Sequence, residues 1–357
     1  MTLNKNIIKF SKECIETSKF YNPLKNFKLD SHLIEIRKDP LTSRRTRINI
    51  QRSSRPKQES INNKEVNEIL RESGKDCMFC KRNIESRTPK FFEKIISHDR
   101  IKCGQCVLFP NLFPFGRYHA VGILSERHIT DISEVSFENF RDCFEACIGF
   151  FNRINEMDPT YVYPLISLNF LQPSGSSIVH PHVQALIEKE PYGETNSFIE
   201  ESHSYFEKNS RNYWKDLFQI EKMNESRYIG KIGCVEYITS FAPRNNNEVI
   251  GVIFSDNSYI TELKREEIKD LSLSLSKLFK AFSKMGLNSF NMSFHSGPIN
   301  RSISDYFLII IKIISRPLLK AFYTNDKGFM EVILDDPVIS SLPEKTATSL
   351  KKYFKSS

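Results

Sequence analysis

Apolar and polar positions along this chain of 357 residues follow two periods, and each period predicts a different element. Alternation at every second residue, or a short apolar run bounded by Pro, Gly or Asn, is typical of a strand. Apolar residues spaced three and four apart are typical of an amphipathic helix. The first pattern predicts strands at 32–36, 46–50, 107–124 (two strands around a turn at 111–116), 163–170, 180–187, 235–242, 248–254, 290–295, 306–314 and 330–334. The second pattern predicts helices at 133–152, 197–222, 262–285 and 343–354.

Two segments near the N-terminus follow neither period. Residues 1–30 are expected to be irregular or partly helical, and residues 51–75 to form a loop with a short helix. Between them, the strands at 32–36 and 46–50 flank Asp39-Pro40-Leu41-Thr42, a sequence typical of a turn. We therefore expect a hairpin over residues 32–50.

The predicted elements recur in the same order on both sides of about residue 200. Strands come first, then one long helix, then more strands. This order predicts an α+β protein of two related halves, each with an antiparallel sheet and a long helix. We accordingly divide the chain into a basic leader at 1–30, an N-terminal half at 31–196 and a C-terminal half at 197–357.

The charge of the chain is concentrated near its N-terminus. The sequence has 51 Lys and Arg against 43 Asp and Glu, a formal net charge of +8. Residues 1–60 hold 14 of the cations and 6 of the anions, so the rest of the chain is balanced. A uniformly basic surface that would bind nucleic acid is therefore excluded, and the local excess is disfavoured as a specific nucleic-acid site.

Apolar runs in the sequence are too short for a membrane span. The longest, residues 306–314, contains Lys312 and is far shorter than the roughly 20 residues that a spanning helix needs. The first residues lack the apolar region of a secretory signal. We expect a cytoplasmic protein that has no membrane partner, in which the 8 Cys are thiols or metal ligands.

The strongest chemical signal is an alternating pattern of polar side chains within a predicted strand. His180, His182 and Gln184 are two residues apart and share one face of the strand. A rigid strand that carries an imidazole suits nucleophilic catalysis, because the attacking nitrogen must be held in a fixed geometry. The preceding turn, Gly175-Ser176-Ser177, offers amides and hydroxyls to an anion. A pair of ordinary core histidines is the alternative, and the added Gln184 and Ser-rich turn disfavour it.

A second signal is the pair Cys77 and Cys80, whose spacing suits two thiolates on one tetrahedral zinc. The site needs two more ligands. Cys103 and Cys106 would complete a four-Cys site of zinc-ribbon spacing. His128 and His180 would complete a Cys2His2 site instead. The residue types alone leave both sets open.

The order of these motifs resembles the galactose-1-phosphate uridylyltransferase family of the histidine-triad superfamily, which also includes enzymes like ADP-glucose phosphorylase. The resemblance extends from about residue 35 to the C-terminus. The motifs that carry it are Asp39-Pro40-Leu41-Thr42, Arg52-Ser53-Ser54-Arg55-Pro56, Cys77-Met78-Phe79-Cys80, Asn111-Leu112-Phe113-Pro114, Glu126-Arg127-His128, residues 169–184, Asn291-Met292-Ser293-Phe294-His295 and Arg316-Pro317-Leu318-Leu319.

The resemblance implies a histidine-triad-like fold and a role for each matched residue. His182 would attack the α-phosphorus of a nucleoside diphosphate compound to give a nucleotidyl-histidine, and Gln184 would hold a phosphoryl oxygen. The hydrolase branch has a His at the position of Gln184, so this residue favours transfer over hydrolysis. Structural zinc would bind to Cys77, Cys80, His128 and His180 in the N-terminal, catalytic half. Substrate would contact Arg52, Arg55, Asn111, Phe113, Asn169, Gly175, Ser176 and Ser177.

The chain departs from the family at a second metal site made of one Glu and three His. His295 matches one of these ligands, but the positions of two others are Ile311 and Ile313, and the Glu position is Phe198. Apolar side chains cannot bind a cation, so we expect this second site to be absent. Ser176 stands where uridylyltransferases often have Cys, which favours other branches of the family.

The leading functional hypothesis is a nucleotidyltransferase that exchanges a nucleotidyl group between a nucleotide sugar and a sugar 1-phosphate, as a UDP-glucose:hexose-1-phosphate uridylyltransferase does. The first alternative is a phosphorylase or hydrolase of ADP-sugars or dinucleoside polyphosphates. The second is a zinc-stabilised protein that binds nucleotides or nucleic acid without catalysis. The expected partners are a nucleotide sugar, a sugar phosphate or orthophosphate, and a second copy of the chain in a homodimer.

Overall fold

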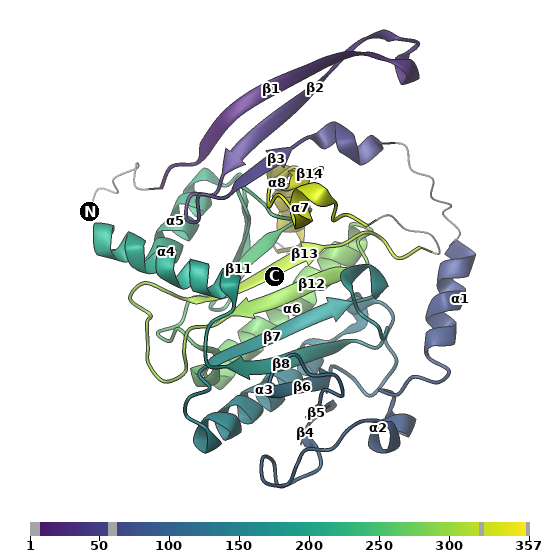
Figure 1. Cartoon of the computed structure of the whole chain (residues 1–357), viewed down its shortest axis with the longest axis vertical. Coiled ribbons are helices and arrows are strands. Elements are labelled where there is room, and N and C mark those ends of the chain that lie inside the picture. The colour runs from purple at the N-terminus through teal and green to yellow at the C-terminus, as the bar shows by residue number, and fades with distance from the viewer. Residues whose placement is uncertain (1–7, 56–62, 321–324, 355–357) are drawn as a thin grey trace.

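The computed structural model describes residues 8–55, 63–320 and 325–354, and a ten-stranded sheet lies at its centre (Figure 1). Every neighbouring pair in this sheet is antiparallel. The mixed α+β class predicted from the sequence is therefore confirmed. In spatial order the strands are β4 (Ile101–Cys103), β5 (Cys106–Pro110), β6 (Tyr118–Ile123), β8 (His182–Glu188), β7 (Tyr163–Phe170), β12 (Phe290–His295), β13 (Ile309–Ser315), β11 (Val249–Ile253), β10 (Val235–Thr239) and β9 (Tyr228–Ile232).

Along the strand order of this sheet, the strands that precede residue 200 form one half and the strands that follow it form the other half. Strands β4 to β8 form one side and β9 to β13 the other, and β7 pairs with β12 where they meet. The sequence predicts a separate sheet in each half, whereas these strands of the two halves join in one continuous ten-stranded sheet. This pairing gives hydrogen-bond partners to two strands that would otherwise be open edges.

Two long helices cover one face of the large sheet. Helix α3 (Phe137–Met157) and helix α6 (Arg265–Lys284) pack on each other, with the rings of Phe140 and Phe279 stacked 5.9 Å apart. Alternate strand residues such as Val183 join the same apolar core. Because neighbours along a strand point to opposite faces, His182 and Gln184 lie on the face away from these helices. Helix α8 (Pro343–Phe354) closes the core at the β9 and β10 end of the sheet.

The opposite face is covered in part by two shorter helices, α4 (Gly193–Asn209) and α5 (Tyr213–Asn224). The sequence predicts that 197–222 is helical, and the structure divides this segment between α4 and α5. The helix ends because Ser210 adopts a left-handed conformation with φ of 51°. A new helix begins because the Asn212 side chain accepts hydrogen bonds from the first backbone amides of α5. Trp214 and Phe198 then pack against Ile250 and Ile310 of the sheet.

A second sheet contains four strands: β1 (Ser11–Asn22), β2 (Lys28–Lys38), β3 (Arg45–Ile48) and β14 (Val338–Ile339). Residues 1–7 of the segment expected to be irregular or partly helical lie outside the described residues, and for the rest of 1–30 that expectation is wrong, since β1 pairs with β2 from Ser11 to Asn22. Most of its side chains are exposed on both faces, so the sequence shows no apolar alternation there. The hairpin over 32–50 is confirmed as β2 and β3. In Figure 1 the β1–β2 hairpin extends away from the large sheet.

Three short helices complete the outline. Helices α1 (Asn63–Ser73) and α2 (Lys81–Arg87) flank the Cys77 and Cys80 segment. Helix α7 (Phe329–Val332) replaces the strand predicted at 330–334, because the Glu331 side chain accepts a hydrogen bond from the Gly328 amide and favours a helical turn. The 3₁₀ helices are η1 (Pro23–Lys25), η2 (Ile50–Ser54), η3 (Ile132–Glu134), η4 (Gln172–Ser174) and η5 (Ile260–Glu262).

None of the helices in the described parts of the chain combines the length and the apolar character that crossing a membrane requires.

Candidate functional site

A cavity of about 360 Å³ lies beside strand β8 on the face that the long helices leave free. Its wall combines backbone turns, amide side chains and aromatic rings. Phe79, Phe109 and Phe115 supply apolar surface. The residues predicted from the sequence that line it are Asn111, Phe113, Asn169, Gly175, Ser176, Ser177, His182 and Gln184.

His182 is held in one tautomer by the backbone. Its Nδ1 lies 2.8 Å from the carbonyl oxygen of His180. A carbonyl oxygen only accepts hydrogen bonds, so Nδ1 carries the proton and Nε2 keeps a free lone pair. Burial lowers the pKa of His182 and favours the neutral ring. The edge-on ring of Phe79, 5.2 Å away, fixes the orientation of the imidazole. A neutral imidazole with a free Nε2 is a nucleophile.

Gln184 is oriented by a histidine that the sequence analysis missed, His119. The Phe115 amide donates to His119 Nδ1 at 3.0 Å, so in the neutral ring the proton is on Nε2. Burial lowers the pKa of His119, which favours the neutral ring. Its Nε2 lies 2.9 Å from Gln184 Oε1 and 3.1 Å from Asn111 Nδ2, and of these two atoms the Gln184 oxygen is the acceptor. The amide nitrogen of Gln184 is left for the cavity, where it can donate to an anion. The only sequence signal for His119 is its place in a buried strand.

The turn after β7 brings backbone amides to the cavity. Two residues of this turn have a positive φ, 65° at Leu171 and 90° at Gly175. At Gly175 this conformation costs little, because glycine has no Cβ atom. The Gly175 amide bonds within the turn, to Gln172 O at 2.9 Å. In the described part of the chain, the amides of Ser176 and Ser177 have no such partner. They are the donors that the turn can offer to an anion.

Four side chains converge next to the cavity as a candidate metal centre. The ligand atoms of Cys77, Cys80, His128 and His180 all lie within 4.8 Å of one another. The Sγ–Nδ1 distances are 3.6 Å from Cys80 to His128, 3.8 Å from Cys80 to His180, and 3.7 Å from Cys77 to His180. Zinc bonded tetrahedrally to S at about 2.3 Å and N at about 2.0 Å places such atoms about 3.5 Å apart. The geometry fits zinc.

The other ring nitrogens support the same assignment. His180 Nε2 donates to Ser125 O at 2.7 Å. His128 Nε2 lies 2.9 Å from Ser73 Oγ, whose own proton goes to Leu70 O. Both Nδ1 atoms therefore carry free lone pairs toward the thiols, as metal ligands must. Without a cation, burial and the nearby Cys77 thiol raise the pKa of Cys80 to about 11. A bound divalent cation would favour the thiolate forms of Cys77 and Cys80, because its charge offsets both the burial and the repulsion between the two sulfur atoms.

The four-Cys alternative does not form. Cys103 and Cys106 face each other across the β4–β5 hairpin. Cys103 donates to Glu145 of helix α3 at 3.4 Å, and Cys106 is buried in the main core. Within the described residues, neither belongs to the cluster around Cys77 and Cys80.

Arg52 and Arg55 are not brought to the His182 cavity. They lie on and after the 3₁₀ helix η2 and line a different cavity of about 440 Å³, together with Asn246 and Arg316. Both guanidinium groups are on exposed residues. Within one chain, the two arginines therefore line one cavity, and the other residues predicted to contact substrate line the His182 cavity.

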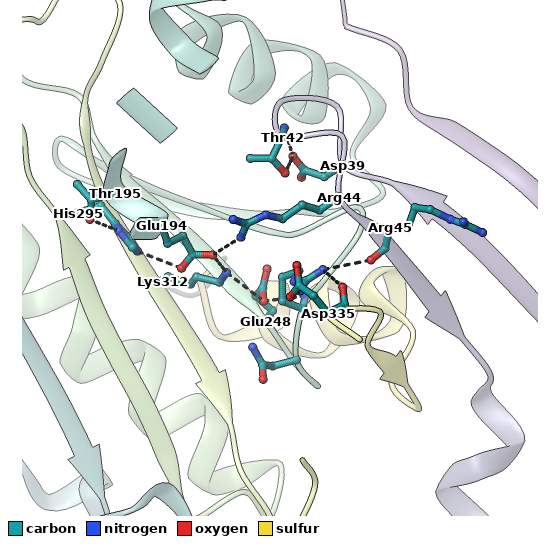
Figure 2. A network of polar contacts seen from close by, with 12 residues as sticks. Asp39, Thr42, Arg44, Arg45, Glu194, Thr195, Glu248, His295, Lys312 and Asp335 are labelled. Carbon is teal, nitrogen blue, oxygen red and sulfur yellow. Dashed lines mark hydrogen bonds and ion pairs between the residues drawn. The ribbon is translucent and has the colours of Figure 1, made fainter. Parts of the chain in front are cut away.

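His295 lies in a buried network of charged groups, shown in Figure 2. Its Nδ1 lies 2.9 Å from Thr195 Oγ1, and its Nε2 is 3.7 Å from Glu194 Oε2. The Lys312 ammonium lies 2.7 Å from Glu194 and 3.6 Å from Glu248. Burial alone would raise the pKa of Glu194, but Lys312 and then His295 lower it to about 2.

The positions expected for the other ligands of a second metal are occupied differently. Ile311 and Ile313 are fully buried in the core that contains the long helices, on the sheet face away from His295. Phe198 contacts the edge of the His295 ring at 5.1 Å. Glu194, one helical turn earlier, is the carboxylate beside His295, and the Lys312 ammonium is its cationic partner.

Comparison with known proteins gives a fold for the whole chain. No family profile matches the sequence. A protein of Archaeoglobus fulgidus, described as uncharacterized, is 29% identical over 330 residues, covering 92% of this chain and 94% of that protein. The ADP-glucose phosphorylase of Arabidopsis thaliana, solved with bound ADP-glucose, has a TM-score of 0.68 at 18% identity and covers 89% of this chain and 98% of its own. A uridylyltransferase has a TM-score of 0.65 at 18% identity, covering 90% and 98%. The chain shares its fold with these two enzymes.

The metal centre gives a first prediction. The purified protein should contain about one zinc per chain, bound by two thiolates and two imidazoles. Cys80→Ser should lose this zinc and lower the unfolding temperature by roughly 5–10 °C, because metal binding energy is lost from the folded state. Metal analysis and thermal unfolding measure both. Cys103→Ser is the matched control, and equal zinc loss in this variant would contradict the Cys2His2 site.

The His295 network gives a second prediction. Burial lowers the pKa of His295 to about 4, against an ordinary value of 6.5. Between these values the unfolded chain binds a proton that the folded chain does not. The free energy of unfolding should therefore fall by up to about 3 kcal/mol as the pH falls from about 6.5 to about 4.

The His295→Gln variant has no imidazole at this position to bind the proton. Its free energy of unfolding, measured with denaturant, should therefore depend less on pH between about 6.5 and about 4 than that of the wild type. The exposed His203→Gln serves as control. Parallel pH curves for His295→Gln and the wild type would show that His295 does not titrate as described.

Proposed function

We propose that this protein is a nucleotidyltransferase that transfers a nucleotidyl group between a nucleotide sugar and a second phosphate compound through a covalent intermediate on His182. The single observation that carries the proposal is the tautomer of His182, with its Nε2 lone pair free in a cavity lined by hydrogen-bond donors. The shared fold with a uridylyltransferase and an ADP-glucose phosphorylase supports the same class of reaction.

In the first displacement, Nε2 of His182 attacks the α-phosphorus of the nucleotide sugar. A P–N bond forms, the P–O bond to the sugar phosphate breaks, and the sugar phosphate leaves as an anion. The imidazole gains positive charge during this step while its proton stays on Nδ1. The hydrogen bond from Nδ1 to the carbonyl oxygen of His180 strengthens as that charge develops, so it stabilises the transition state.

The donors around the cavity suit the negative charge on the phosphoryl oxygens. Gln184 of β8 and Ser176 and Ser177 of the turn after β7 line the same cavity, and their amide N–H groups are the donors assigned to this role. Donors fixed before the reaction stabilise developing charge without reorganisation. The apolar rings of Phe113 and Phe115, which line the same cavity, provide surface for a nucleoside base.

In the second displacement, an oxygen of the incoming phosphate compound attacks the same phosphorus, the P–N bond breaks and neutral His182 is restored. A hexose 1-phosphate would make the protein a uridylyltransferase-like enzyme. Orthophosphate would make it a phosphorylase of ADP-sugars, which the likeness to the ADP-glucose phosphorylase supports. Dependence of turnover on orthophosphate separates the two.

We assign Cys77, Cys80, His128 and His180 as zinc ligands with a structural role. Zinc, when bound, supplies charge that neutralises the two thiolates. His180, whose carbonyl oxygen orients His182, is then fixed on both sides of its ring by the ligand bond and by Ser125 O.

We further propose that the protein is a homodimer in which Arg52 and Arg55 of one copy reach the His182 cavity of the other. The support is their position in a separate cavity of their own chain and their exposure. Arginine suits this role because its planar fork donates two hydrogen bonds to a phosphate.

The covalent intermediate gives a third prediction. Incubation with α-³²P-labelled ADP-glucose or UDP-glucose should label the protein, and the label should be stable to base and labile to acid, as a phosphoramidate is. His182→Ala should carry no label, because no other group supplies the nucleophile. Gel autoradiography after denaturation measures this directly.

His203→Ala, at an exposed histidine of helix α4, should be labelled as the wild type is. Equal labelling of His182→Ala, or no labelling of the wild type by either nucleotide sugar, would refute the proposed mechanism.

The shared site gives a fourth prediction. His182→Ala and the double variant Arg52→Ala/Arg55→Ala should each be inactive alone. After mixing, unfolding and refolding together, about a quarter of the wild-type activity should return, because half of the dimers are mixed and each holds one intact site. Mixed dimers are verified with two affinity tags. If they form and no activity returns, the two arginines do not act across an interface.

A further inference from the structure

Asn169 is an amide side chain of the cavity that lies outside β8, the strand of His182 and Gln184. It lies on β7, lines the His182 cavity and is half-buried. An asparagine can present either a donor or an acceptor to a ligand, depending on which end of the amide faces it. Only the Nδ2 end would bind an anionic phosphoryl group. Some neighbour must therefore decide whether Asn169 attracts or repels phosphate.

That neighbour is Asn291, which lies directly opposite Asn169 where β12 pairs with β7. Asn291 Nδ2 lies 2.6 Å from Asn169 Oδ1 and 2.8 Å from the carbonyl oxygen of Ser174. Its two amide protons thus reach both the cavity side chain and the η4 turn that precedes Ser176. One side chain connects two parts of the proposed phosphate site.

The orientation of Asn291 follows from two independent partners. Arg316 Nη1 lies 2.8 Å from Asn291 Oδ1, and a guanidinium only donates. The Ser174 carbonyl only accepts, so it requires the Nδ2 end. Both constraints give the same orientation. Arg316 is itself held by Asp326, whose carboxylate accepts from its Nε and Nη2 at 2.8–3.2 Å.

We propose that Asn291 is a positioning residue, held by Arg316, that turns the Nδ2 end of Asn169 toward the phosphoryl group in the His182 cavity. The role rests on the proposed nucleotidyl transfer for its purpose, but the orientation itself predicts anion binding without any transfer. Since Oδ1 of Asn169 is occupied by Asn291, its Nδ2 is the end left for the cavity, as the Gln184 Nε2 is left by His119. Two amides from different strands would then donate beside His182.

The test is the variant Asn291→Asp, which keeps size and can pair with Arg316 but cannot donate to Asn169. The Asn169 amide should rotate and present its oxygen to the cavity. Affinity for inorganic pyrophosphate, measured by calorimetry on the zinc-loaded protein, should fall about 10- to 100-fold, the effect of losing a hydrogen bond to a charged group. Ser293→Ala is the matched control, because Ser293 lies on the same strand and bonds only to Ser167 among the described side chains.

A double-mutant cycle separates positioning from a general effect of the added negative charge. In the Asn169→Ala background, Asn291→Asp should cause no further loss of pyrophosphate affinity. An equal loss with and without Asn169 would show a charge effect only and would overturn the proposal. Unchanged affinity in Asn291→Asp, or no pyrophosphate binding by the wild type, would also overturn it.

Unfolding curves and zinc content verify that each variant is folded, and Asn291→Ala replaces Asn291→Asp in the same cycle if the latter does not fold. Labelling of His182 is measured in parallel. A protein that shows the predicted affinity cycle but no labelled His182 keeps the positioning role and loses the proposed transfer. A protein that is labelled but shows no change in the cycle keeps the transfer and loses the positioning role.

Discussion

One backbone hydrogen bond, from His182 Nδ1 to the carbonyl oxygen of His180, sets the chemistry of this site. It places the ring proton away from the cavity, so that Nε2 faces the cavity as a lone pair. It also gives the ring a partner that can stabilise positive charge when Nε2 forms a bond. A neutral buried imidazole without such a partner could adopt either tautomer, and one of the two would present a proton instead of a nucleophile. The other hydrogen-bond donors around the cavity can assist the proposed transfer only if His182 is protonated on Nδ1 and not on Nε2.

The fold holds that carbonyl oxygen in place from several directions. His180 is fully buried, its Nε2 donates to Ser125 O and its Nδ1 faces the two thiols. The next residue, Pro181, has no backbone amide, and its carbonyl oxygen accepts from Leu124 N at 3.0 Å. Strand β8 then lies between β6 and β7 in the sheet. The candidate metal cluster and the sheet thus fix the two ends of the segment from His180 to His182, the proposed nucleophile.

Local patterns in the sequence predicted the parts of the site that depend on local spacing. His180, His182 and Gln184 share a face because a strand alternates, and Cys77 and Cys80 lie in one candidate metal cluster because their spacing allows it. Contacts between distant strands left no such pattern. Nothing in the sequence around His119 or Asn291 shows that each orients an amide on another strand. Strand β1 was missed for a related reason, because its side chains are mostly exposed and show no apolar alternation. The segment at Phe329–Val332 was assigned wrongly because its apolar residues Phe329 and Val332 are exposed and reflect no core.

The most direct test of this account is the tautomer of His182 in the free, zinc-loaded protein, measured by ¹⁵N NMR of labelled histidine with His182→Ala for assignment. The account predicts a proton on Nδ1 and a bare Nε2 near neutral pH. It also predicts that removal of zinc, which frees His180, yields a mixture of tautomers. A protonated Nε2 in the zinc-loaded protein would contradict the account, because the ring would then have no lone pair with which to attack phosphorus.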